Sequence, residues 1–263
     1  MSLIFSAFVP HSPVLLPTLG QEHLPKAQAT IAALKQLEQE LYAAKPETII
    51  IISGHNEEIP NAFSLNHSPQ LTANFKNFGD LKTTLNFTNN LGLAYKLKQK
   101  LETTVALQLT TPENLSYGIS IPLFYLANHL PNIKIIPIQT SNLPLTAHWE
   151  LGKIIRHEID LVTDRVAIIA AGNLAHSNLE SLTTQTDLAA DHFNRSFLEK
   201  FQQKQTQTLL DIGENEIKDL EICGLKPALF LAGAVDGINY HAEVLSYEMP
   251  LGIGWAVMAL ALS

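Results

Sequence analysis

The chain contains little cysteine and has no apolar run long enough to cross a membrane. Of its 263 residues only Cys223 is a cysteine, which excludes an internal disulfide and is typical of a reducing compartment. The apolar stretch 251–262 is too short and too rich in glycine to span a bilayer. The apolar N-terminal stretch lacks the basic residues of a signal peptide, and Pro10 interrupts it early. We therefore expect a cytoplasmic protein.

Positive charge is also scarce. The chain has 17 Lys and Arg against 25 Asp and Glu, a net charge of −8, and no basic cluster stands out. Nucleic acids and anionic membrane surfaces bind basic patches, so neither is expected as a partner. A hydrophobic content of 46% is that of an ordinary globular protein, and the length allows a large core.

Short apolar runs alternate with stretches of helical spacing. The runs are rich in β-branched or aromatic residues and predict strands buried on both faces, at 2–9, 47–53, 133–138 and 165–171. Apolar residues at helical spacing predict helices at 26–44, 91–101, 121–130, 146–161 and 188–201. This alternation predicts a layered α/β domain.

Two stretches depart from the alternation. Residues 61–88 alternate polar and apolar side chains, which indicates a hairpin or an excursion at the sheet edge. Residues 240–262 resemble two late strands joined by a turn of proline and glycine. Because no internal repeat, low-complexity tract or linker is visible, we expect one domain over residues 1–263.

Three of the ten histidines each follow a predicted strand. His11 lies in Pro-His-Ser-Pro after the first run, His55 follows the second through Ser-Gly, and His176 follows the run 165–171 through Gly-Asn-Leu-Ala. Ligands of open α/β sheets bind beyond the carboxyl ends of the strands. A single strand-end histidine is more often structural, but three with the same placement predict a metal site or an acid–base site.

A third ligand can be sought among the carboxylates. Two histidines and one carboxylate form the facial arrangement that leaves open positions on Fe(II). Glu221 is favoured because it opens an apolar segment that should be buried, where a carboxylate needs a partner such as a cation. The alternative is a carboxylate stabilised at a helix N-terminus. Cys223 is either a soft ligand or inert packing. The other carboxylates considered are Glu57, Glu58, Glu113, Asp191, Glu243 and Glu248.

The ordered motifs resemble those of a known superfamily. They are Pro-His-Ser-Pro, Ile-Ile-Ser-Gly-His, Ala-Gly-Asn-Leu-Ala-His-Ser, and a tail with Cys-Gly-Leu-Lys-Pro, Gly-Ala-Val-Asp-Gly and Gly-Ile-Gly-Trp. Together they resemble the LigB-like members of the class III extradiol ring-cleavage dioxygenase superfamily, over nearly the whole chain. The likeness is greater to the branch related to Memo proteins than to the catechol-cleaving members.

The resemblance implies a three-layer α/β domain with a central mixed, mostly parallel sheet flanked by helices. It also implies non-haem Fe(II) held by His11, His55 and Glu221, with His176 as the acid–base residue. In Memo-like relatives a cysteine serves near the glutamate position, so Cys223 is the alternative third ligand. The resemblance therefore implies an extradiol-type dioxygenase that acts on a catechol- or aminophenol-like substrate and O₂.

One position departs from the catechol-cleaving members. Tyr117 stands where they have a histidine beside the metal site. A phenol donates a hydrogen bond but does not shuttle protons near neutral pH, so we expect Tyr117 to position the substrate. Two alternatives remain open, a non-catalytic Memo-like metal-binding or interaction protein and a zinc-dependent hydrolase with His176 as base. The substrate and the oligomeric state, a homo-oligomer included, are also open.

Overall fold

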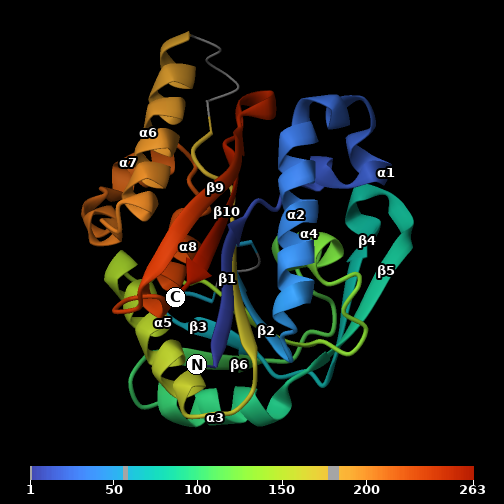
Figure 1. The fold of residues 1–263 in the computed structure, drawn as a ribbon, viewed down its shortest axis with the longest axis vertical. Coiled ribbons are helices and arrows are strands. Elements are labelled where there is room, and N and C mark those ends of the chain that lie inside the picture. The colour runs from blue at the N-terminus through green and yellow to red at the C-terminus, as the bar shows by residue number, and fades with distance from the viewer. Residues whose placement is uncertain (1, 56–58, 177–183) are drawn as a thin grey trace.

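The computed structural model describes residues 2–55, 59–176 and 184–263 (Figure 1). Within these ranges one ten-stranded sheet forms the centre of the molecule. Its strands are β1 (Leu3–Val9), β2 (Thr48–Ser53), β3 (Phe63–Asn66), β4 (Gln70–Phe75), β5 (Asp80–Asn89), β6 (Leu107–Thr110), β7 (Lys134–Gln139), β8 (Val166–Ala171), β9 (Tyr240–Glu248) and β10 (Trp255–Leu262).

The helices lie mostly between strands. The α-helices are α1 (Pro17–Gly20), α2 (Gln28–Ala44), α3 (Leu91–Leu101), α4 (Tyr117–Leu126), α5 (Leu145–Asp160), α6 (Thr184–Gln202), α7 (Glu214–Asp219) and α8 (Leu225–Ala234). Short 3₁₀ turns are η1 (Pro13–Leu15), η2 (Gln21–Ala27), η3 (Lys76–Phe78), η4 (Thr206–Asp211) and η5 (Pro250–Gly252). None of the helices in the described ranges is long and apolar enough to cross a membrane.

The sheet is mixed and mostly parallel, as predicted. Its order is β4-β5-β7-β2-β8-β1-β10-β9, and β3 pairs with both β6 and β7. The central strands β7, β2, β8 and β1 are mutually parallel, whereas β4, β9 and β10 add antiparallel pairs at the two ends.

Helices cover both faces of the central strands, which confirms the layered α/β fold. Ile50 and Ile52 of β2 point into a core shared with α3, α5, α6 and α8. The alternate residues Ile49 and Ile51 point into a second core shared with α2 and α4. In Figure 1, α2 lies on one side of the strands and α6 and α8 lie on the other. Burial on both faces explains why these strands are uninterrupted apolar runs.

The irregular regions agree with the sequence only in part. The stretch 61–88 contains the expected hairpin, β4–β5, at the end of the sheet, and 240–262 forms the two expected late strands. The expected start of the helix at 121 is wrong, because α4 begins at Tyr117 and contains Pro122. A start at 121 would put Pro122 in the first turn, which is where proline is usually found in helices. In the structure Pro122 lies further inside the helix. The strands β3 and β6 and the helix α8 were not expected.

The three strands that precede the singled-out histidines end at one level. Ala171 of β8 is in register with Val9 of β1 on one side and with Ser53 of β2 on the other. The loops that follow these strands therefore leave the sheet at the same edge, which is where ligands bind in open α/β sheets.

Candidate metal centre

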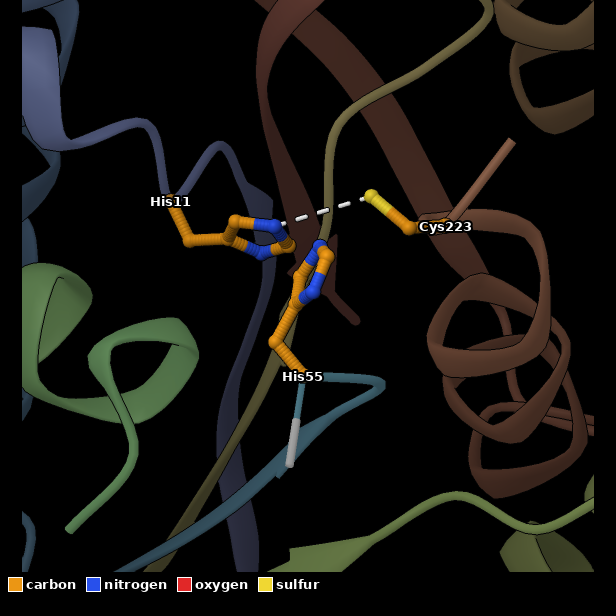
Figure 2. A group of neighbouring side chains, drawn as sticks. All are labelled: His11, His55 and Cys223. Atoms are coloured by element: carbon orange, nitrogen blue, oxygen red, sulfur yellow. Dashed lines mark hydrogen bonds between the residues drawn. The ribbon is translucent and has the colours of Figure 1, made fainter. Parts of the chain in front are cut away.

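Three donor side chains meet at this edge of the sheet. His11 lies two residues beyond β1, His55 two residues beyond β2, and Cys223 just before α8. One ligand atom from each lies within 4.8 Å of the others (Figure 2). Among the described residues, this is the one group of His, Cys, Asp or Glu close enough to hold a metal ion together.

The spacing of the donors fits a single first-row metal ion. His11 Nε2 and Cys223 Sγ are 3.6 Å apart. Metal–nitrogen and metal–sulfur bonds of about 2.0 and 2.3 Å at a tetrahedral angle place the two donors about 3.5 Å apart, close to this distance. The rings of His11 and His55 meet edge to face with centroids 4.5 Å apart, and one nitrogen of each lies within 4.8 Å of the other and of the sulfur.

Burial sets the charge state of two donors. It holds the pKa of His11, which is fully buried, well below its usual value, and the nearby His55 lowers it further. The imidazole is therefore neutral, with a lone pair for a metal. Burial also raises the pKa of Cys223 to about 11, partly offset by a hydrogen bond from the Asn173 backbone N–H to Sγ. A bound cation would favour the thiolate.

Tyr117 lies directly beside the two histidines. Its ring centroid is 5.0 Å from that of His55 and 5.8 Å from that of His11. The next residue, Gly118, allows this approach, since a Cβ there would lie 2.3 Å from Ser53 Oγ and 3.2 Å from His55 Cβ. The missing side chain lets the first turn of α4 pack against the end of β2.

His176 and Glu221 form a separate pair. His176 Nδ1 is 3.5 Å from a carboxylate oxygen of Glu221, whose side chain is 76% exposed. The other ring nitrogen, Nε2, is buried and has no hydrogen-bond partner in the described part of the chain. Burial lowers the pKa of His176 and outweighs the opposing effect of Glu221. The result is a neutral imidazole oriented by a carboxylate, with one free lone pair.

The singled-out residues thus divide between two clusters. His11 and His55 come together, and Cys223 rather than Glu221 lies with them. His176 is near enough for its charge to depress the pKa of His11, after the larger effects of burial and His55. Of the other carboxylates considered, Glu57 and Glu58 lie outside the described residues, and Glu113, Asp191, Glu243 and Glu248 do not belong to the group.

A cleft of about 650 Å³ opens beside His55 and Tyr117. Its far wall comes from the β4–β5 hairpin, which contributes Lys76 and Phe78, and the Phe78 ring meets Tyr117 edge to face at 5.4 Å. The remaining lining residues are Asn74, Asn77, Asn114, Leu115 and Ser116. The sequence did not indicate these hairpin residues. A hairpin tip that covers a site has the same local sequence pattern as a hairpin tip exposed to solvent.

Comparisons with known proteins identify a family and a shared fold. The family model for the catalytic LigB subunit of aromatic ring-opening dioxygenase matches residues 6–258. Protein CA_C1420 of Clostridium acetobutylicum is 23% identical over 270 residues, which cover 99% of this chain and 58% of that protein. This chain therefore spans little more than half the length of that relative.

A solved structure shares the fold. The crystal structure of the uncharacterized protein JW3007 from Escherichia coli K12 aligns with a TM-score of 0.68 at 16% identity, over 98% of this chain and 99% of that one. The motifs at the strand ends, the fold and the family match over nearly the whole chain lead to one conclusion. The chain belongs to the LigB family of catalytic subunits of aromatic ring-opening dioxygenases.

Proposed function

We propose that this protein is an extradiol-type dioxygenase that uses Fe(II) and O₂ on a small aromatic substrate of the catechol or aminophenol kind. The observation that carries the proposal is the group of His11, His55 and Cys223 beside a cleft with aromatic walls. Membership of the LigB family supports the same class of reaction.

The metal would be held by His11, His55 and Cys223. Two neutral imidazoles and one thiolate carry the same total charge as the two histidines and one carboxylate of non-haem Fe(II) oxygenases. Three protein ligands leave further positions open. When bound, Fe(II) supplies a template that brings a bidentate substrate and O₂ together and passes electron density between them.

The aromatic substrate would bind in the cleft next to His55. The rings of Tyr117 and Phe78 give it an apolar, aromatic surface. Burial raises the pKa of Tyr117, so the phenol stays protonated and donates a hydrogen bond to a substrate oxygen. Tyr117 would therefore bind and orient the substrate.

Proton transfer would fall to His176. Its buried Nε2, which has no hydrogen-bond partner among the described residues, would accept the proton of a substrate hydroxyl and return it later in the reaction. The carboxylate of Glu221 at Nδ1 fixes the ring and stabilises the imidazolium formed in between.

The thiolate donor favours a second candidate function. Thiolates suit zinc and Cu(I) better than carboxylates do. A Memo-like metal-binding protein without catalysis would keep this same donor group, and so would a zinc-dependent hydrolase with His176 as base.

Anaerobic purification followed by metal analysis and an O₂-uptake assay separates these functions. We expect iron to bind, and catechols or aminophenols to cause O₂ uptake that His55→Ala abolishes together with the metal. Zinc at full occupancy, with hydrolysis and no O₂ uptake, would favour the hydrolase. Protein that binds metal but stays inert with every metal and substrate would favour the binding protein.

A further inference from the structure

We propose that Asn173 is a positioning residue that holds His11 and Cys223 at the separation a metal requires, and so sets the metal affinity of the site. This inference rests on the proposed metal site. Asn173 lies two residues beyond the end of β8, between the loops that carry the two donors.

Asn173 contacts both donor residues with different groups. Its side-chain Oδ1 accepts a hydrogen bond from the backbone N–H of His11 at 3.3 Å. Its own backbone N–H donates to Cys223 Sγ at 3.3 Å. Its carbonyl oxygen accepts from the backbone N–H of Gly224 at 2.7 Å. One residue therefore links the loop after β1 to the segment before α8.

The contact between Asn173 and the segment 223–224 is tight. A Cβ on Gly224 would lie 2.6 Å from the Asn173 carbonyl oxygen and 2.9 Å from the ring of Phe8. A Cβ on Gly172 would lie 2.2 Å from the Cα of Gly224. Since the two backbones are packed against each other, Cys223 has little freedom to move relative to Asn173.

On the His11 side, Asn173 makes the link through its amide oxygen. His11 is fully buried, so its backbone N–H would lose its acceptor if that oxygen were removed. The loop would then shift to find another acceptor, and a displacement of about 0.5 Å already impairs a metal site. Changes of outer partners of this kind typically lower metal affinity by 10- to 100-fold.

The test compares variants of Asn173 by titration with Co(II) or Zn(II) against a competing chelator. Asn173→Ala should weaken binding by about 10- to 100-fold. Asn173→Asp keeps an oxygen acceptor at the same place and should restore the affinity to within a few-fold of the natural protein. The thiolate-to-Co(II) absorption band reports whether Cys223 is bound in each variant.

Asn89→Ala is the matched control. Asn89 is also buried and donates from its side chain to the carbonyl of Asn66 at 2.8 Å, but its register with Ile135 places it at the opposite edge of the sheet. It should lower the melting temperature without changing the metal affinity.

Three results would overturn the inference. These are unchanged affinity in Asn173→Ala, equal loss in Asn173→Ala and Asn173→Asp, or equal loss in Asn89→Ala. Asn173→Ser, with a shorter oxygen acceptor and an expected intermediate affinity, replaces Asn173→Ala if the latter does not fold. A natural protein that binds neither ion would instead overturn the proposed metal site itself.

Discussion

Glu221 and Cys223 are two residues apart, yet their side chains reach different partners. Glu221 has a left-handed backbone conformation (φ 46°) in the turn after α7, and its side chain is mostly exposed beside His176. Cys223 follows after Ile222, which is buried, and its Sγ lies against His11 Nε2. The turn at Glu221 thus assigns the carboxylate to His176 and the sulfur to the histidine pair.

This geometry predicts which of the two residues holds the metal. Cys223→Ser should deplete the bound metal strongly, because a neutral hydroxyl replaces an anionic donor. Glu221→Ala should retain it, because its carboxylate lies outside the donor group. Metal analysis of both purified variants makes the comparison. Depletion in Glu221→Ala with retention in Cys223→Ser would instead identify the glutamate as the ligand.

His176 should separate catalysis from metal binding. His176→Gln should keep the metal but reduce turnover by about 10²–10⁴-fold, the usual contribution of an acid–base group. Turnover is measured by O₂ uptake with the substrate found in the screen. His157→Gln, an exposed histidine on α5, serves as the control and should leave both quantities unchanged. Loss of metal from His176→Gln would make His176 a ligand.

At the scale of elements, α5 carries a histidine whose burial links stability to pH. His148 is fully buried, and its ring meets Phe63 of β3 edge to face at 4.9 Å. Its Nε2 accepts from the backbone N–H of Ser141 at 3.3 Å, so Nδ1 carries the proton and donates to the carbonyl of Pro144 at 3.2 Å. Burial lowers the pKa of His148 to about 4, and these bonds require the neutral ring.

The folded pKa of His148 lies below the unfolded value of 6.5, so acid should weaken the fold. Between these values the unfolded chain takes up a proton that the folded chain does not. The contribution of His148 is complete above pH 6.5 and falls by about 3 kcal/mol as the pH approaches 4. Urea unfolding at pH 7 and pH 4.5 measures it. His148→Gln should show a smaller difference between the two pH values, and an equal one would exclude His148 as the cause.

Some elements were predictable and others were not, for physical reasons. The helix 91–101 has a regular apolar stripe and an Asn90 cap that accepts from the Leu93 N–H, and the structure reproduces both expected ends. By contrast, α8 is buried all round, with no polar face to give it a helical period. The four-residue strands β3 and β6 exist through their mutual pairing and the pairing of β3 with β7, which local sequence does not show.

At the scale of the whole molecule, the order of strands creates the site. Residues 9, 53 and 171 are far apart in sequence, but β2, β8 and β1 are adjacent and parallel, so their following loops meet. The hairpin β4–β5 lies at one end of the sheet, yet its tip lines the cleft beside His55. The two histidine donors come from loops that follow strands and Cys223 comes from the segment before α8, whereas the far wall of the cleft comes from the β4–β5 hairpin.

The sequence by itself determined the central strands and the histidines that follow them, because strand burial and strand-end placement are properties of short segments. It also indicated His11, His55 and His176 as one functional region. Only the tertiary structure decided that Cys223 lies with His11 and His55, that Glu221 contacts His176, and that Phe78 faces Tyr117. These partners are set by a turn, by close backbone contact at Gly224 and by the path of a hairpin, none of which leaves a periodic signal in the chain.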